Sequence, residues 1–521
     1  MVNLTVTRLL RDRALADPDG VALIVRGSAP LTYGQWEERS TEIANGLLGR
    51  GVTRGDRVGL VFGSGDWTDY AVAFFGVLKA GAAAVPLSDR LAPADLRFML
   101  GHCGAAGVVH AEGADAPAEG WTVTPEVLRA EGASVSAAVS AAETSHERAD
   151  PDPGDLAQIL YTSGTTGRPK GVAANHANLA HGCGGRRRPF AHSRHLVHAF
   201  PIGTNAGQTM LINALDAHPA VVTLPRFTPG RFAALIESYR AGTVFLVPAM
   251  AIELLNAGVA ERHDLSSVLL LGSAAAPLPS TVAEALTGAF PNATITNYYT
   301  STEAAPAQTI MMFDPERPGS VGRAVAGGRI KIATPEGEPL APGETGEVWM
   351  RSPAASRSYY GDPESGTFRD GWVRMGDLGR LDPDGYLYLV DRESDVVKSG
   401  AYKVSTLHVE EAVFGHPAVV EAAAFGVPHP VLGTVVAVAL VVREPLAAEE
   451  LRVFLSDRLA PQELPAHVIT VPALPRNAGG KADKRALRET LVSGTAPGAV
   501  SDSGTASGAA AAPGAAEEIP V

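Results

Sequence analysis

Short apolar segments alternate with helical patterns over most of the first 300 residues of this 521-residue chain. Arg57–Phe62, Ala82–Leu87 and Gly107–His110 have the length and composition of buried strands, and a helical pattern fills each interval between them. The same alternation returns at Leu196–Phe200, Val221–Leu224, Val244–Val247 and Val268–Leu271. Strands separated by helices pair in parallel and need helices on their faces. The chain is therefore expected to be an α/β protein with mostly parallel sheets.

The pattern changes twice towards the C-terminus. From Arg329 the segments are strand-like and separated by Gly/Pro turns, and after Asp391 a compact set of strands and helices begins. We expect a large multi-sheet N-terminal domain over residues 1–391 and a small α+β domain over 392–490. Residues 491–521 are mostly Ala, Gly, Ser, Thr and Pro, which predicts a disordered tail. Glu112–Pro153 has weak periodicity and is expected to be a surface excursion of the large domain.

Composition argues against several classes of protein. Lys and Arg total 43 against 56 Asp and Glu, and this formal net charge of -13 argues against a nucleic-acid binder. No run of about 18 apolar residues is present, so no membrane span is expected. The two cysteines, Cys103 and Cys183, are too few for a disulfide scaffold or a four-cysteine zinc site. We expect a cytoplasmic protein with reduced thiols.

The stretch 161–171, with the sequence YTSGTTGRPKG, follows the apolar strand Leu156–Leu160. Its small residues leave backbone N–H groups free to converge on an anion, and its hydroxyl groups add donors. The spacing is not that of the Walker A motif. A nucleotide- or phosphate-binding loop is predicted, with a flexible linker as the alternative. The binding candidates are Thr162, Ser163, Gly164, Thr165, Thr166, Gly167 and Lys170.

This loop resembles the signature loop of the adenylate-forming (ANL) superfamily, which contains acyl-CoA synthetases, adenylation domains of peptide synthetases and beetle luciferases. Four further stretches resemble motifs of that family in the expected order, so the resemblance covers about residues 5–490. These stretches are Tyr298–Glu303, Gly376–Asp377, Val390–Gly400 and Pro475–Lys481. The resemblance implies an AMP-dependent carboxylic acid ligase of the acyl-CoA synthetase type, with a small mobile α+β C-terminal domain.

The resemblance also implies the reaction. A carboxylate attacks the α-phosphorus of ATP, pyrophosphate leaves, and the acyl group of the acyl-adenylate then passes to a thiol. Both reactants of the first step are anionic, so a cation is needed where charge develops. Lys481 is the expected cation, and a solvated surface lysine is the alternative. The neighbouring Asp483, Lys484 and Arg485 are expected to be solvated.

Further roles at the ATP site follow from the same resemblance. Glu303 would hold Mg²⁺, a cation that prefers carboxylate and phosphate oxygens, and Thr302 would bind the α-phosphate. Asp377 would accept both ribose hydroxyls, with Arg392 beside it at the domain junction. Tyr299 would stack on adenine. The other candidates for the adenine pocket are Ala275, Ala276, Asn297 and Tyr298.

Departures from the family pattern bear on the acid and on the acceptor. Thr300 stands where glycine is usual and would tighten the acyl pocket, and Gly203-Thr204 replaces the usual Phe-His pair. Polar side chains favour a small or functionalised acid over a long fatty chain. The acyl-pocket candidates are Thr204, Asn205, Gln208, Ser273 and Thr300. The thiol-side loop would consist of Lys398, Ser399, Gly400 and Ala401, where Ala401 replaces a second glycine.

The expected enzyme is an AMP-forming acid–thiol ligase that uses ATP, Mg²⁺ and coenzyme A on a small-molecule carboxylic acid. Thr300 and Ala401 keep another acceptor open: an acyl carrier protein, an amine or another nucleophile. A luciferase-like oxidase and a non-catalytic binding protein on the same scaffold are two further alternatives. Retention of Lys481, Glu303 and Asp377 together argues against the last of these.

Overall fold

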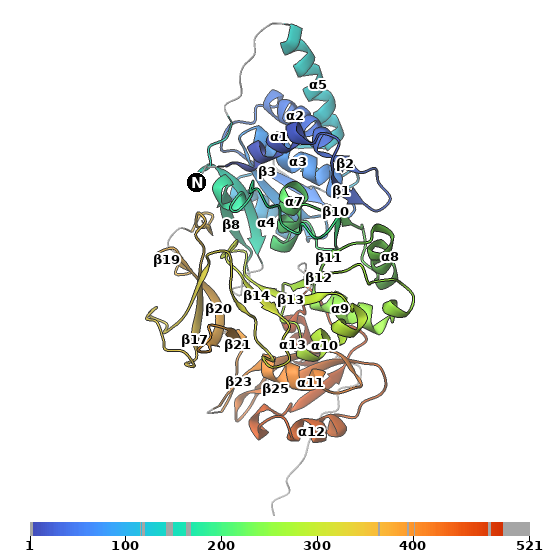
Figure 1. Cartoon of the computed structure of the whole chain (residues 1–521). Helices are drawn as coiled ribbons and strands as arrows, with labels where there is room; N and C mark the ends of the chain where they lie inside the picture. The colour runs from blue at the N-terminus through green and yellow to red at the C-terminus, as the bar shows by residue number, and fades with distance from the viewer. Residues whose placement is uncertain are drawn as a thin grey trace, which may run out of the picture.

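The structure is a computed structural model that describes residues 4–114, 116, 120–141, 150–162, 168–362, 365–392, 395–400, 402–477 and 481–492, with only the backbone over 135–141. The N-terminal part contains two large sheets with helices on their faces, and a third, smaller sheet lies beside them (Figure 1). A separate lobe, coloured orange to red in Figure 1, follows at the C-terminal end.

The largest sheet has nine strands in the order β15-β14-β13-β12-β11-β9-β10-β1-β2. The strands from β1 to β13 in this order pair in parallel, and β2, β14 and β15 are antiparallel. Their bounds are β1 (Val21–Val25), β2 (Leu31–Thr32), β9 (His195–His198), β10 (Ala220–Thr223), β11 (Thr243–Leu246), β12 (Leu270–Ala274), β13 (Thr294–Tyr299), β14 (Thr309–Met312) and β15 (Arg323–Ala324).

Helices cover this sheet because their apolar faces are buried against it. Helices α8 (Pro229–Tyr239), α9 (Pro248–Asn256) and α10 (Ser280–Ala289) pack on it, with Leu271 of β12 and Ile295 of β13 in the same buried cluster. Helix α7 (Asn205–Asp216) contributes to a second buried cluster that joins the two large sheets. A short 3₁₀ turn, η1 (Val259–Glu261), follows α9.

The second sheet has seven strands in the order β18-β8-β7-β4-β3-β5-β6. Its strands are β3 (Arg57–Phe62), β4 (Ala83–Ser88), β5 (Gly107–His110), β6 (Trp121–Val123), β7 (Leu156–Thr162), β8 (Lys170–Asn175) and β18 (Ser358–Tyr359). The neighbouring helices are α1 (Val6–Ala16), α2 (Tyr33–Gly49), α3 (Trp67–Lys79), α4 (Pro93–Cys103) and α6 (His176–Leu179). Trp36 and Phe75 stack edge to face at 4.9 Å in the core between these elements.

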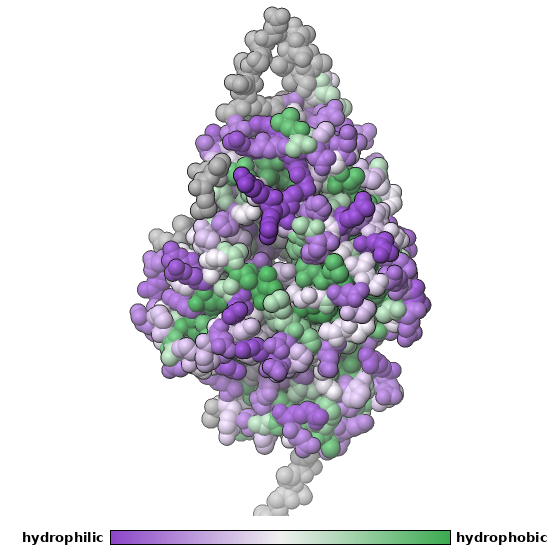
Figure 2. Space-filling view, in the orientation of Figure 1, coloured by the Kyte–Doolittle hydropathy of each residue, from purple (hydrophilic) through white to green (hydrophobic). Residues whose placement is uncertain are grey.

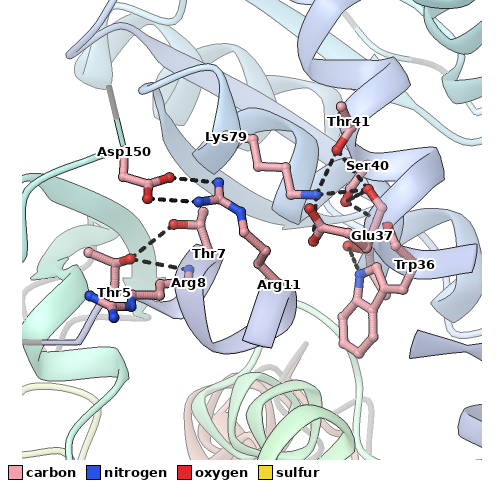
Figure 3. A network of polar contacts seen from close by, with 11 residues as sticks. Thr5, Thr7, Arg8, Arg11, Trp36, Glu37, Ser40, Thr41, Lys79 and Asp150 are labelled. Atoms are coloured by element: carbon pink, nitrogen blue, oxygen red, sulfur yellow. Dashed lines mark hydrogen bonds and ion pairs between the residues drawn. The ribbon is translucent and has the colours of Figure 1, made fainter. Parts of the chain in front are cut away.

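Two polar clusters lie beside the first three helices and line one small cavity (Figure 3). Lys79 of α3 donates to Thr41 Oγ1 at 2.9 Å and forms an ion pair of 2.8 Å with Glu37 of α2. Arg11 of α1 binds both carboxylate oxygens of Asp150, at 2.8 and 2.7 Å. Because each charge has an opposite partner, the small cavity of about 240 Å³ between these residues is electrically balanced.

The expectation for 112–153 was incomplete, because a long helix, α5 (Pro125–Ala141), lies within it. Helix α5 packs directly on α2, where glycines on both helices let the backbones approach. A Cβ on Gly46 would meet the Leu128 carbonyl oxygen at 2.3 Å, and one on Gly132 would meet that of Glu42 at 1.8 Å. The Ala- and Ser-rich sequence hid the helix, because its contact with α2 depends on glycines at the points of close approach, with Leu128 as a buried apolar residue beside them.

The third sheet has five strands and begins where the sequence becomes strand-like. Its strands are β16 (Arg329–Ala333), β17 (Gly346–Arg351), β19 (Phe368–Arg369), β20 (Trp372–Leu381) and β21 (Leu387–Arg392). The C-terminal lobe has β22 (Val397–Ser399), β23 (Tyr402–Val404), β24 (Val419–His429), β25 (Gly433–Val442) and β26 (His467–Thr470), with α11 (Thr406–Phe414), α12 (Ala448–Ser456), η2 (Pro461–Glu463) and α13 (Lys484–Val492).

The two lobes meet through a small set of contacts. Glu411 of α11 accepts from the Ser280 backbone N–H at 3.1 Å, and Arg443 donates to Asn256 at 2.7 Å. Phe414 and Val420 pack against the cluster formed by α8–α10. Figure 2 shows apolar residues gathered at the middle of one face, around the region where Figure 1 places β12–β14.

The fold class is confirmed: a large multi-sheet α/β domain is followed by a smaller α+β domain. Strand β21 ends at Arg392, beside the predicted domain boundary, and α13 extends two residues past the predicted end at 490. The rest of the predicted tail, 493–521, lies outside the described residues. Within the described part of the chain, no helix is both long and apolar enough to cross a bilayer.

Candidate active site

Strands β7 and β8 form the hairpin that carries the predicted phosphate loop. They pair antiparallel and place Thr162 directly opposite Lys170. The Lys170 ammonium lies 4.6 Å from the centre of the Tyr359 ring. The other loop candidates, Ser163, Gly164, Thr165, Thr166 and Gly167, lie outside the described residues.

Glu303 is held by two hydroxyl groups. Tyr359 donates to its Oε1 at 3.1 Å, and Thr162 donates to the same oxygen at 3.5 Å. Burial raises the pKa of Tyr359, and the Glu303 charge adds to the rise, so the phenol stays protonated as a donor. Both of these bonds go to Oε1.

This arrangement fits a magnesium ion that is bound chiefly through its substrate. In the described part of the chain, no group of three or more His, Cys, Asp or Glu side chains could hold a metal by itself. Mg²⁺ commonly takes one or two carboxylates together with phosphate and water oxygens. Glu303 would supply the carboxylate.

Tyr299, Asp377 and Arg392 meet where the first and third sheets approach. The Tyr299 hydroxyl donates to Asp377 Oδ2 at 2.5 Å, and Arg392 Nε lies 3.6 Å from Oδ1. Asp377 of β20 pairs with Arg392 of β21 in register, so the sheet itself places the cation beside the carboxylate. Burial raises the pKa of Asp377, and the Arg392 charge and the Tyr299 hydrogen bond oppose that rise.

Two polar side chains lie side by side beneath this corner. Ser273 of β12 and Asn297 of β13 are directly opposite each other, and both are buried. Neither Ser273 Oγ nor Asn297 Oδ1 has a hydrogen-bond partner among the described residues. Unpartnered buried groups are costly, so they suit a ligand with polar edges such as a purine base. Ala275, at φ +74°, and Ala276 follow immediately in the loop after β12.

The structure does not bring Tyr298 together with the other adenine candidates. Successive strand residues point to opposite faces, and Tyr298 therefore turns away from Tyr299. It stacks against Phe245 at 5.4 Å and lines a groove of about 440 Å³ that also contacts Leu270, Ile310 and Met312. The alternation of side chains in a strand is the reason for this correction.

Lys481, from the C-terminal lobe, approaches the same corner. Burial, together with the nearby Arg392 cation, lowers the pKa of Lys481 to about 8, although the Asp377 and Glu303 carboxylates oppose the drop. Asp377 and Glu303 are thus carboxylates of the N-terminal domain whose charges act on Lys481. Its backbone is fixed by two bonds with Asn477: Asn477 N–H donates to the Lys481 carbonyl at 2.9 Å, and Lys481 N–H donates to Asn477 Oδ1 at 3.1 Å.

Lys484 is not a solvated residue as the sequence suggested. Its ammonium lies 2.9 Å from Glu410 Oε1 and 3.0 Å from Thr406 Oγ1. Thr406 in turn donates its hydroxyl to Asp391 Oδ1 at 3.2 Å. Burial raises the pKa of Asp391 to about 6, and the Thr406 backbone N–H and the Lys484 charge oppose that rise. Helix α13, which follows Lys481, is thereby tied to the domain junction.

Several predicted acyl-pocket residues have structural partners instead. Thr204 is the N-cap of α7 and accepts from Gly207 N–H at 3.1 Å. Gln208 is buried and accepts from Tyr70 at 2.8 Å and from Gln158 at 2.9 Å. Thr300 donates to the Ala307 carbonyl at 2.6 Å. The Thr204 hydroxyl and the Gln208 amide are therefore already engaged in hydrogen bonds within the protein.

The thiol-side candidates lie in the β22–β23 hairpin. Lys398 is exposed, Ser399 is buried, and Gly400 has a φ of +58°. Their recorded hydrogen bonds stay within the C-terminal lobe: Thr434 donates to the Lys398 carbonyl at 2.7 Å, and Gly400 N–H donates to Leu432 at 2.9 Å. Ala401 lies outside the described residues. This structure thus presents Lys481, and not the hairpin, to the site.

Two residues of the site were missed in the sequence: Tyr359, which binds Glu303, and Arg357. Arg357 donates to Asn205 at 3.2 Å and to the Thr302 carbonyl at 2.8 Å. Both reach the site because β18 pairs with β8 across more than 180 positions of sequence, Tyr359 opposite Val172. No local motif signals such a pairing.

Comparison with known proteins agrees with this geometry. The family model for the AMP-binding enzyme matches residues 10–360, and that for the AMP-binding enzyme C-terminal domain matches residues 408–481. The chain belongs to the AMP-binding enzyme family. The resemblance to the ANL superfamily of acyl-CoA synthetases is confirmed, and the two matched regions fall on the two lobes.

Individual members of the AMP-binding enzyme family match over nearly the whole chain. A feruloyl-CoA synthase of Amycolatopsis sp is 32% identical over 499 residues, covering 91% of this chain and 97% of the relative. An oxalate–CoA ligase of Arabidopsis thaliana is 30% identical, covering 93% and 98%. Among solved structures, the o-succinylbenzoate coenzyme A synthetase of Bacillus subtilis in complex with AMP matches with a TM-score of 0.77 and 25% identity, covering 93% and 97%.

Proposed function

We propose that this enzyme joins a small carboxylic acid to coenzyme A in two steps, and that Lys481 serves the first. The observation that carries the proposal is that Lys481 from the C-terminal lobe is buried where its charge interacts with those of Asp377 and Glu303 from the N-terminal one. A cation, a ribose-binding carboxylate and a metal-binding carboxylate are the groups that adenylation requires.

In the first step the acid carboxylate attacks the α-phosphorus of ATP, and the bond to pyrophosphate breaks. Asp377, oriented by Tyr299, accepts from the ribose hydroxyls, and Ser273 and Asn297 meet the edge of the base. Lys481 donates to the α-phosphate oxygens, where negative charge accumulates in the transition state. A magnesium ion held by Glu303 would neutralise phosphate charge.

In the second step the thiol of coenzyme A attacks the acyl carbon, and AMP leaves. The β22–β23 hairpin with Lys398, Ser399 and Gly400 would approach the site for this step while Lys481 withdraws. Such a change requires rotation about the few residues after Asp391, which is a hinge motion. We place the pivot at Ser394, in the stretch Val390–Gly400 that resembles a family motif, and this residue lies outside the described residues. The relatives are named as a CoA synthase and a CoA ligase, so a carrier protein or an amine is not the favoured acceptor.

We further propose small or functionalised acids as the substrate class. Asn205 and Arg357 give the pocket polar atoms, whereas a site for long fatty chains would be mostly apolar. Relatives that act on ferulate and on oxalate, as their names state, support this class. The supply of ATP and coenzyme A, together with the free Cys103 and Cys183 thiols, is consistent with a cytoplasmic site of action.

The test is a screen of acid-dependent pyrophosphate release over aryl, short aliphatic, long-chain and amino acids. Each acid is assayed with and without coenzyme A, and the products are identified by mass spectrometry. We expect release with at least one small acid, and an acyl-CoA only when coenzyme A is added. Absence of acid-dependent release across the panel would refute adenylation, and a product that requires O₂ would indicate an oxidase.

A further inference from the structure

A buried arginine without an acidic partner lies beside the reaction centre. Arg357 precedes β18, and only 8% of its surface is exposed. Its Nε donates to Asn178 Oδ1 at 2.9 Å, and its Nη1 donates to Asn205 Oδ1 at 3.2 Å and to the Thr302 carbonyl at 2.8 Å. All three acceptors are neutral. Within the described residues no carboxylate lies within ion-pair distance of this guanidinium, and Nη2 has no hydrogen-bond partner.

A cation in this position is expensive unless an anion comes to it. Taking a charge out of water costs several kcal/mol. Only an opposite charge in good geometry offsets a cost of that size. Burial lowers the pKa of Arg357 to about 10, and the Glu303 carboxylate opposes the drop. The guanidinium is still charged at neutral pH, and the Glu303 carboxylate compensates its charge only from beyond ion-pair distance.

The first turn of α7 adds to the same positive region. Asn205 is the first residue of this 12-residue helix, and Thr204 caps it by accepting from Gly207 N–H. The backbone N–H groups of Asn205 and Ala206 have no recorded partner among the described residues. A helix N-terminus carries a partial positive charge, and here a buried guanidinium is fixed to its first side chain.

The location favours the acid over the phosphates. Arg357 contacts the Thr302 carbonyl from the side of α7, where the acyl-pocket candidates lie. The phosphate loop and Lys170 lie along the β7–β8 hairpin, and Lys481 and Arg392 belong to the corner beside Asp377. We propose that Arg357, with the first turn of α7, binds the carboxylate of the acid and holds it next to the α-phosphorus. This inference rests on the proposed function.

Binding at one carboxylate oxygen leaves the other free to attack. The attacking oxygen forms the bond to phosphorus, the bond to pyrophosphate breaks, and the carboxylate charge is lost in the mixed anhydride. Arg357 can then donate to the acyl carbonyl oxygen, on which negative charge develops when a thiol attacks. The same side chain therefore serves acid binding first and carbonyl polarisation second.

The test compares Arg357→Gln and Asn205→Asp with the unchanged enzyme. The probe is whichever of butyrate, succinate, benzoate and ferulate gives the fastest acid-dependent pyrophosphate release. We expect both variants to raise KM for the acid at least tenfold, with KM for ATP within twofold. Asn205→Asp is informative because it keeps the shape of the side chain and places a carboxylate 3.2 Å from Nη1. Its Tm should be unchanged or higher, which separates lost binding from lost folding.

The control is Asn292→Asp, a surface substitution far from these residues, which should leave KM unchanged. A structural role for Arg357 predicts that Asn205→Asp raises the Tm without changing KM for the acid, and that result would overturn the proposal. A raised KM for the acid with succinate alone would assign Arg357 to a second anionic group of the substrate. A raised KM for ATP alone would assign Arg357 to the phosphates. Either result would contradict the proposal. If the unchanged enzyme releases no pyrophosphate with any acid, the proposed function fails and this inference fails with it.

Discussion

The hydroxyl of Tyr299 donates a hydrogen bond of 2.5 Å to Asp377, the residue that would bind the ribose. The two come from different sheets, β13 and β20, so this bond connects the base pocket to the sugar site. Tyr299 was expected only as a stacking ring. The structure gives it a second task, which is to fix one carboxylate oxygen so that the other faces the ligand.

Tyr299→Phe should therefore weaken ATP binding while keeping the ring. A hydrogen bond to a charged group contributes about 1.5–3 kcal/mol, so we expect KM for ATP to rise by roughly 10-fold or more. KM for the acid should stay the same. Asp377→Asn should raise KM for ATP further. An unchanged KM for ATP in Tyr299→Phe would show that Asp377 needs no such support.

Lys481→Ala should divide the two half-reactions. Acid-dependent pyrophosphate release should fall by about 10²–10³-fold, the usual loss when one donor to a developing oxyanion is removed. Thioester formation from supplied acyl-AMP should change less than threefold, because Lys481 leaves the site in that step. Arg485→Gln, on the exposed side of the next helix, is the control. Equal losses in both half-reactions would contradict the division of labour.

The rate of adenylation should fall as the pH rises through about 8, because the free enzyme loses the charge of Lys481 there. The measurement is kcat/KM for ATP between pH 6.5 and 9.5, and Lys481→Arg should move the descending limb to higher pH. The contribution of Lys481 to the free energy of unfolding changes with pH in the opposite direction. The unfolded chain, with a pKa of 10.5, binds more protons than the folded one between pH 8 and 10.5, so this group favours folding more as the pH rises.

Gly132→Ala should destabilise the N-terminal domain, because the added Cβ would lie 1.8 Å from the Glu42 carbonyl oxygen. Overpacking of this kind costs about 1–3 kcal/mol. Gly49→Ala is the matched control in the partner helix α2, where a Cβ would meet nothing within 4 Å. That change should stabilise by up to about 1 kcal/mol through helix propensity. The measurement is the urea midpoint of unfolding of both variants. Equal midpoints would show that α5 can move away from α2.

Lys484→Met should destabilise the C-terminal lobe and disturb the junction. The change leaves Glu410 without its 2.9 Å partner, and loss of one member of a partly buried pair costs about 2 kcal/mol. Glu410→Gln combined with Lys484→Met should recover part of the loss, as a double-mutant cycle in thermal unfolding would reveal. Additive losses would mean that the pair does not interact.

The sequence was informative where chemistry is local. Strands such as Arg57–Phe62 and Gly107–His110 have the predicted bounds, because continuous apolar runs are needed in buried parallel strands. The candidate site was predictable as a set of motifs in order along the chain. Lys481, Asp377 and Glu303 were named on that ground, and the structure brings them together.

Long-range pairing was not predictable. Tyr359 and Arg357 enter the site through the pairing of β18 with β8, and α5 was hidden because it packs with glycines. Lys484 was taken for a surface lysine because its partners Glu410 and Thr406 are more than 70 residues away. Tyr298 could have been corrected from sequence alone, since adjacent residues in a strand cannot share a face.

The contacts between the lobes have a consequence for how the enzyme works. Besides the junction at Asp391–Thr406 and the approach of Lys481, they include a few exposed polar bonds, at Ser280–Glu411 and Asn256–Arg443, and a small apolar contact at Phe414 and Val420. An interface this slight does little to choose one orientation over another. The bound ligand then determines which relative orientation of the two lobes is more populated. Turnover proceeds because each reaction step consumes the ligand that stabilised the orientation in which that step took place.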